Sequence, residues 1–409
     1  MIVSSFVPIR VQSLYGLSAF LSTFARLNFS WLPFLFGIAR KGRSRAWAGR
    51  RTGREDGVVR RGAVRCGMVI VGAFTVGALS RIAEAHEKWF IDAGAYPLRL
   101  EEALAAPGVW LAIGGPIVLW AVAMVLWKWR QKRSFVPGPG ALGGRPEARE
   151  ALYAFMPLVL AVHLGVPLLV NGLNHTLFTP NNGLEGIWAH LLTLGQIGVA
   201  LGLFYGTPTR IAALFLALMW GVGLFVVGVE PMLEAIHILG FSAFFYCAGR
   251  GPFAVDRALF PKWEPGPALL AWAVPLLRVG IGLSLIVMAF TEKLFNVPMA
   301  VAFLAEYPLN FLLALGIPIT DAQFVLMVGA VELLVGLCIM SGAFLRDIIV
   351  IAWFPFNLTL GIFGPEELVG HLPFYGAMAL FFLWGVTDPE NLAAWERGIL
   401  RPSLGALLR

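Results

Sequence analysis

The chain consists largely of long apolar runs separated by short polar or Pro- and Gly-rich connections. About 20 apolar residues are enough for a helix to cross a bilayer. We therefore expect an all-α, polytopic transmembrane protein with about ten spans. The runs that predict them are Met68–Ile82, Gly108–Trp127, Leu152–Leu173, Trp188–Tyr205, Ile211–Val229, Ile236–Ala248, Ala268–Phe290, Phe324–Met340, Ile348–Phe363 and Leu372–Trp384.

Composition excludes an ordinary soluble protein. Hydrophobic residues make up 58% of the 409-residue chain and charged residues only 13%, against about half and about a quarter in soluble domains. So few charged side chains cannot cover a globule of this size. Membrane lipids are therefore the expected surroundings.

The net charge of +7 is concentrated near the start of the chain. Residues 1–66 hold twelve Lys and Arg against Glu55 and Asp56. Without a nucleic-acid-binding motif beside it, this charge does not predict a nucleic-acid partner, whereas Lys and Arg do resist export across a membrane. We expect a cytoplasmic basic arm at 1–66, although the apolar stretch 17–38 leaves a further span open, and a transmembrane hairpin at 67–133. The tail 387–409 is also expected on the cytoplasmic side, in an inner (cytoplasmic) membrane protein.

Two four-span blocks, 151–250 and 267–386, repeat each other's spacing. Shared offsets of this kind predict a duplication into two parallel bundles, related by an axis along the membrane normal. Gln196 and Glu332 each precede a glycine by ten residues, and Arg210 and Arg346 each follow that glycine by four. The other matched positions are Gly165 and Gly282, each twelve before a Leu-Phe pair, and Pro231 and Pro365, each six before His237 and His371.

Arg278 and Glu332 are the clearest ionisable residues inside predicted spans. They lie eleven and ten residues from the cytoplasmic ends near Pro267 and Gly342, a depth of about 15–16 Å at helical rise. Equal depth on successive antiparallel helices predicts a buried ion pair. The pair either holds the bundle together or belongs to a redox or proton-linked site. The first block offers neutral groups at similar depth, which are His163 and Gln196.

A second polar belt is expected near the outer face. Its members are Asn174, His175, Glu292, Lys293, His237 and His371. One interpretation is ordinary interfacial polarity. The other is a quinone-headgroup site, in which a His or Lys donates to a carbonyl oxygen while a carboxylate exchanges protons.

Other cofactors are not favoured by the sequence. His163 and His175 are not matched by histidines at equal depth on facing helices, so haem is not expected. No His, Cys, Asp and Glu cluster has metal-ligand spacing, and the three cysteines form no pair in sequence. Quinone is the one cofactor class that the outer belt suits.

The second block resembles the DoxX family and the similar MauE-type membrane proteins. The motifs are Leu277-Arg278-Val279-Gly280-Ile281-Gly282, Glu292-Lys293-Leu294-Phe295, Glu332-Leu333-Leu334-Val335-Gly336-Leu337, Gly342 with Arg346, and Gly370-His371-Leu372. The resemblance covers 268–385 well and 151–249 loosely. The first block departs from it, with Ala161, Thr176 and Gln196 at the Arg, Lys and Glu positions.

The resemblance implies a small four-helix unit found in membrane redox systems. It favours an auxiliary or quinone-interacting subunit of a membrane redox complex, with other subunits of that complex as partners. A small-molecule or lipid transporter is the alternative, because parallel duplicated bundles also occur in transporters. A non-catalytic membrane scaffold is a third.

Overall fold

A computed structural model describes residues 87–139, 141, 145–385 and 389–401. This part of the chain is helical, without a β-strand beyond one isolated bridge between Thr176 and Gly183. The all-α prediction is confirmed for these residues. The basic arm at 1–66 and the predicted span Met68–Ile82 lie outside them.

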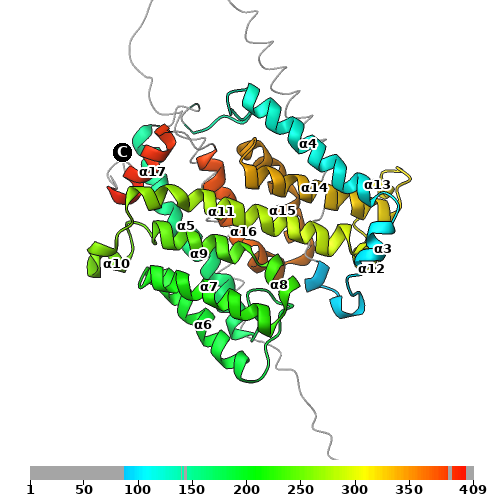
Figure 1. The fold of residues 1–409 in the computed structure, drawn as a ribbon, viewed down its shortest axis with the longest axis horizontal. Helices are drawn as coiled ribbons and strands as arrows, with labels where there is room; N and C mark the ends of the chain where they lie inside the picture. The colour runs from blue at the N-terminus through cyan, green and yellow to red at the C-terminus, as the bar shows by residue number, and fades with distance from the viewer. Residues whose placement is uncertain (1–86, 140, 142–144, 386–388, 402–409) are drawn as a thin grey trace, which may run out of the picture. The chain divides into compact units, whose positions relative to one another are not determined.

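Figure 1 shows the arrangement of the described helices. The long helices are α4 (Val109–Trp129), α5 (Pro146–Leu173), α6 (Gly186–Tyr205), α7 (Thr209–Val226), α11 (Pro267–Met288), α14 (Asp321–Ser341), α15 (Leu345–Phe363) and α16 (Pro365–Trp384). The shorter ones are α3 (Leu100–Ala105), α8 (Val229–Glu234), α9 (His237–Ala248), α10 (Val255–Leu259), α12 (Val297–Glu306), α13 (Phe311–Ala314) and α17 (Pro389–Leu400). Three 3-10 turns, η1 (Glu87–Trp89), η2 (Ala93–Ala95) and η3 (Pro261–Trp263), and a π-helical segment, η4 (Ala289–Leu294), complete the described part.

Seven of the described helices are long and apolar enough to cross a membrane. They are α4, α5, α6, α7, α11 with η4, α14 and α16. The protein is therefore built on several membrane-spanning helices, and the count of ten stays a prediction. Helix α9 has only 12 residues, about 18 Å at helical rise, which is less than a hydrocarbon core of about 30 Å.

Helix ends follow local signals in the sequence. Gly206 and Gly342 adopt φ values of +70° and +81° as the residues that end α6 and α14, a conformation that costs glycine little. Thr320 begins α14 with a capping box, exchanging hydrogen bonds with Gln323. The predicted blocks thus share one kind of helix ending at matched positions.

The two predicted blocks pack against each other over a continuous apolar core. In the first block each helix of the series α5, α6, α7 and α9 packs on the next one. The same holds for α11, α14, α15 and α16 in the second block. Across the blocks α9 packs closely on α11, and α5 packs on α16. Gly240 and Gly280 allow the first approach, because a Cβ on Gly280 would lie 2.6 Å from the Cα of Gly240.

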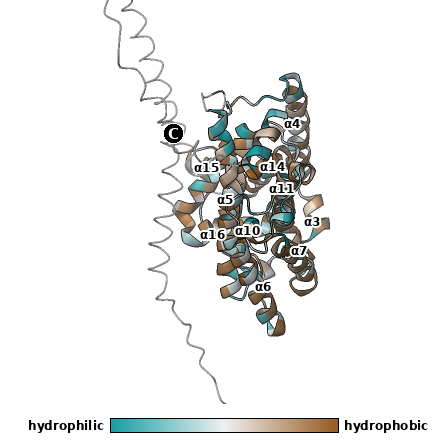
Figure 2. Cartoon of the chain, turned by 90° about the vertical axis from the view of Figure 1, so that its left-hand side faces the viewer, coloured by the Kyte–Doolittle hydropathy of each residue, from teal (hydrophilic) through white to brown (hydrophobic). Residues whose placement is uncertain are grey.

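The helices consist mainly of apolar residues (Figure 2), and many large apolar side chains on them are exposed. On α4, which packs on α14, Trp110, Leu111, Val125 and Trp129 are exposed. Such surfaces on spanning helices are suited to contact with lipid tails.

The predicted tail contains a packed helix. Helix α17 lies against α5, with Trp395 fully buried and Asn391 accepting a hydrogen bond from Tyr153. Trp395 Nε1 also donates to the carbonyl of Leu270, at 3.2 Å. Residues 389–400 therefore close one end of the helical core.

Candidate functional site

The predicted ion pair between Arg278 and Glu332 is wrong. Glu332 lies 3.1 Å from Lys293 Nζ instead. The reason is the register of α11 against α14. A Cβ on Gly282 would lie 2.7 Å from the carbonyl oxygen of Gly336. A Cβ on Gly342 would lie 2.5 Å from a guanidinium nitrogen of Arg278. Arg278 therefore lies at the level of residue 342, ten residues and about 15 Å along α14 from Glu332.

Arg278 instead reaches the carboxyl end of α14. Side chains on a helix lean toward its N-terminus, so Arg278 extends back along α11 toward Gly342. The carbonyl groups at that helix end favour a positive charge. Equal counts from the two helix ends ignored both this lean and the length of the side chain.

Lys293 is the centre of one group of buried charges. Its Nζ lies 3.1 Å from Glu332 Oε2, 3.2 Å from Glu87 Oε2 and 3.8 Å from Glu292 Oε2. The four side chains are each at most 6% exposed. Glu292 and Lys293 lie in the π-helical segment η4, a local form that is frequent at functional sites.

Lys88 forms a second group next to the first. Its Nζ lies 2.6 Å from Glu230 Oε1 and 2.5 Å from Glu234 Oε1, and Thr291 also donates to Glu234 Oε1, at 2.5 Å. Because Glu87 and Lys88 are adjacent in η1, one turn joins both groups. Burial raises the pKa of Glu87 to about 8 although the Lys293 ammonium opposes the shift.

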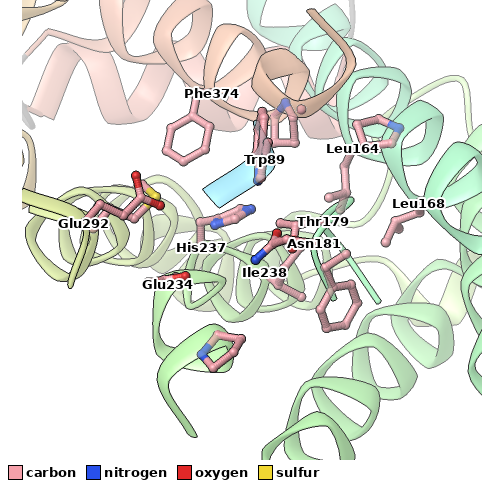
Figure 3. A pocket seen from close by; sticks show the side chains of 16 residues that line it. Trp89, Leu164, Leu168, Thr179, Asn181, Glu234, His237, Ile238, Glu292 and Phe374 are labelled. Atoms are coloured by element: carbon pink, nitrogen blue, oxygen red, sulfur yellow. The ribbon is translucent and has the colours of Figure 1, made fainter. Parts of the chain in front are cut away.

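A small cavity lies beside these charges (Figure 3). Glu234, His237 and Glu292 line it together with apolar side chains that include Trp89 and Phe374. Its volume is about 30 Å³. A water molecule needs a cavity of at least 10–15 Å³, whereas drug-sized ligands occupy pockets of about 300–1,000 Å³. The cavity therefore has the size of one or two water molecules.

His237 is held at the cavity by its neighbours. Its Nδ1 lies 3.0 Å from Ser284 Oγ, and the Ser284 hydroxyl donates to the carbonyl of Glu234. That carbonyl belongs to the break between α8 and α9, where the helix is interrupted at Ala235 and Ile236. Inside a membrane such a break is tolerated where protein supplies hydrogen bonds, as Ser284 does here.

His371 lies near the same end of the helices, in aromatic surroundings. Its Nδ1 is 3.2 Å from Glu367 Oε1, and both side chains are almost fully buried. The ring centroids of Trp89 and Phe356 lie 5.6 Å and 4.7 Å from that of His371. Trp89 therefore contacts His371 and also lines the cavity beside His237.

The first block makes the corresponding contact without charge. Gln196 Nε2 donates to the carbonyl of Thr176 at 2.8 Å, and its Oε1 accepts from the N–H of Phe178 at 3.0 Å. Thr176 and Gln196 occupy the positions that spacing equates with Lys293 and Glu332. The duplication stays a prediction, but the equated pairs touch in both blocks.

The remaining predicted residues lie away from the cavity. His163 is buried in α5 with Nδ1 2.7 Å from the Val159 carbonyl, while Asn174 and His175 are exposed after α5. Arg210 lies over the Tyr246 ring near the end of α9, and Arg346 donates to carbonyls at the end of α16. Of the residues predicted for the outer belt, four lie in or next to the charged groups and the cavity, namely Glu292, Lys293, His237 and His371. Asn174 and His175 lie elsewhere, on the surface.

Sequence reasoning missed Glu87, Lys88 and Trp89. They lie in a mixed-charge segment between the predicted spans Met68–Ile82 and Gly108–Trp127. Each has its partner more than 140 residues further along the chain, which is Lys293 for Glu87, Glu234 for Lys88 and His371 for Trp89. Glu234 had a usable signal, since it precedes His237 by one helical turn. Nothing in the local pattern marks Glu87 as a partner of Lys293.

No protein-family model matches the chain, and neither a curated protein nor a solved structure gives a match. In the described part of the chain, no three or more His, Cys, Asp and Glu side chains are grouped as metal ligands.

Proposed function

We propose that this protein handles protons at a buried charged site within the membrane, as a component of a quinol-linked redox system. The observation that supports this most is the cavity, where Glu234, His237 and Glu292 border a space of about 30 Å³. Carboxyl and imidazole groups are able to exchange protons, and water in that space would connect the three side chains. A quinone ring would not fit there, so the redox partner would exchange protons with the cluster from outside the cavity.

The charge balance supports the same proposal. Four carboxyl groups with side chains at most 11% exposed, Glu87, Glu234, Glu292 and Glu332, surround two ammonium groups. If all were ionised, the cluster would hold an excess of two negative charges. Burying unpaired charge is costly, and carboxyl groups avoid that cost by binding protons. The cluster would therefore store exchangeable protons.

The link to quinol oxidation rests on the resemblance of 268–385 to the DoxX family. In this reading Glu292 and Glu234 accept protons released at the membrane surface, and His237 passes them through the cavity water. The ammonium groups of Lys88 and Lys293 favour the ionised form of the carboxyl groups beside them. Oxidation of a quinol releases two electrons together with two protons, so the expected partners are the subunits of the redox complex that would accept those electrons.

Infrared spectroscopy of the purified protein tests proton storage directly. A protonated carboxyl has its own C=O absorption, and we expect part of it to persist above about pH 5, where exposed carboxyl groups, with pKa values of about 4, are ionised. Glu292→Gln should remove part of that signal. Glu230→Gln is the matched control, because the Glu230 side chain is 40% exposed. If no carboxyl absorption remains above about pH 5 in the wild-type protein, the proposal is wrong.

Quinone extraction tests the redox link separately. Quinone should copurify with the protein, and His237→Gln should not abolish it if the ring stays outside the cavity. Retained proton storage without bound quinone would instead favour the second candidate.

That second candidate is a proton-coupled transporter. The break between α8 and α9 favours it, because interrupted helices often form transporter binding sites. In reconstituted vesicles a transporter would move protons together with a solute, whereas a redox subunit would not do so without its electron donor.

A further inference from the structure

Two histidines of the first block come together on the surface beside α6. His175 directly follows α5, and the connection from 174 to 185 folds back on itself. Leu184 N–H donates to the His175 carbonyl at 2.9 Å, and Thr176 pairs with Gly183. This return brings His175 next to the first turns of α6, where the His190 ring centroid lies 6.4 Å from its own.

Hydrogen bonds fix which ring nitrogen of each histidine carries the proton. His190 Nδ1 lies 3.1 Å from the Gly186 carbonyl, which can only accept. His175 Nδ1 lies 3.1 Å from Thr193 Oγ1. Because Thr193 donates its own proton to the Gly172 carbonyl at 3.0 Å, its oxygen accepts from His175. Both neutral rings therefore have a lone pair on Nε2, the arrangement of metal-ligating histidines with a supporting carbonyl or hydroxyl.

Both histidines line one open hollow that has room for an ion and its water. The hollow measures about 490 Å³ and is lined by His175, Leu184, Glu185, Gly186, Ile187, Ala189 and His190. Glu185 precedes α6 without making a side-chain hydrogen bond to that helix. Its carboxylate is exposed, so it can turn toward an ion as a third ligand.

We propose that His175 and His190 bind a divalent transition-metal ion of the zinc class, with Glu185 and water completing the coordination. Two imidazoles and a carboxylate suit Zn²⁺. With Zn–N bonds of about 2.0–2.1 Å, two rings on one tetrahedral ion have centroids about 5 Å apart. The rings therefore approach by roughly 1 Å on binding, a shift that exposed side chains can make.

The ion would fasten the connection that borders the charged site. Phe178, Thr179 and Asn181 of the same connection line the cavity that Glu234 and Glu292 also line. A bridge from His175 to His190 ties this connection to α6. The metal site shares no residue with the proton site, so Zn²⁺ binding can be measured independently of proton storage.

The test uses the full chain purified with a tag that contains no histidine and stripped of metal with a chelator. Zn²⁺ titration by calorimetry should give one site per chain, and Zn²⁺ should raise the thermal unfolding midpoint. His190→Gln and His175→Asn should each weaken binding by about tenfold or more. Asn is chosen because His175 has φ of +55°, which Asn tolerates better than most residues.

Two further variants serve as controls. Asn174→Ala changes the exposed neighbour of His175 and should leave Zn²⁺ affinity unchanged. His86→Ala removes a histidine outside the described residues and should do the same. His190 lies within regular helix, so His190→Gln decides the matter even if a change at His175 unfolds the protein. An absence of Zn²⁺ binding, or binding that His190→Gln leaves intact, would overturn the proposal.

Discussion

Replacing Lys293 with methionine is the most informative single change in the protein. The substitution keeps the length and apolar stem of the side chain and removes the charge. Lys293 Nζ has carboxylate oxygens of Glu332, Glu87 and Glu292 within 3.1–3.8 Å. Without the ammonium these three buried carboxyl groups face one another. Of the two lysines only Lys88 then remains, and it pairs with Glu230 and Glu234 in the adjoining group.

The size of the effect follows from this geometry. Removing one partner of a buried ion pair costs about 3–5 kcal/mol, and we expect Lys293→Met to reach that range at neutral pH. Glu332→Gln should cost less, about 1.5–3 kcal/mol, the value of a hydrogen bond to a charged group. Lys293 still has two carboxylate partners in that variant. Lower pH should reduce the cost of Lys293→Met, because the stranded carboxyl groups can bind protons.

A double-mutant cycle separates this network from the ion pair that the sequence predicted. Unfolding in detergent micelles, followed by tryptophan fluorescence, gives each change in the free energy of unfolding. Lys293→Met and Glu332→Gln should be coupled by about 0.5–3 kcal/mol. Arg278→Gln and Glu332→Gln should be additive within about 0.5 kcal/mol. Strong coupling of Glu332 to Arg278, with none to Lys293, would refute the register described here.

Burial raises the pKa of Glu87 from 4.5 to about 8, so the folded state binds an extra proton in that range. Its contribution to stability is lost as pH rises from about 4.5 to about 8, and Glu87→Gln should flatten that part of the unfolding profile. Gly280→Ala places a Cβ 2.6 Å from an α9 backbone atom and should cost about 1–3 kcal/mol, whereas Gly198→Ala, which meets nothing within 4 Å, should be neutral or slightly stabilising. In a cysteine-free background, a membrane-impermeant thiol reagent outside the cell should label Asn181→Cys and not Ala258→Cys, and the reverse result would invert the predicted topology.

The sequence predicted the helices well because burial in lipid leaves a strong local signal. Runs such as Gly108–Trp127 and Trp188–Tyr205 correspond closely to α4 and α6. Helix register left no such signal. It depends on where glycines let two backbones approach, as Gly282 does beside Gly336. Counting residues from the helix ends therefore gave Glu332 the wrong partner.

The candidate site was predictable only in part for a related reason. Glu292 and Lys293 stood out because charge inside an apolar run is rare. Glu87 and Lys88 did not, since charges in a polar connection are ordinary. Their burial comes from the packing of a distant segment against η4, and such packing is a property of the whole fold.

The contrast between the two blocks bears on what the buried charges are for. Gln196 connects α6 to the backbone at Thr176 and Phe178 with two hydrogen bonds and no charge. The equated positions in the second block join α14 to η4 through Lys293 and Glu332. A neutral contact is thus sufficient to hold such a junction, and a buried ion pair is often no more stabilising than a neutral replacement. Packing alone gives no reason for four buried carboxyl groups around two lysines. Proton storage does, because a cluster with more carboxyl groups than cations can gain or lose a proton without leaving a lysine unpaired.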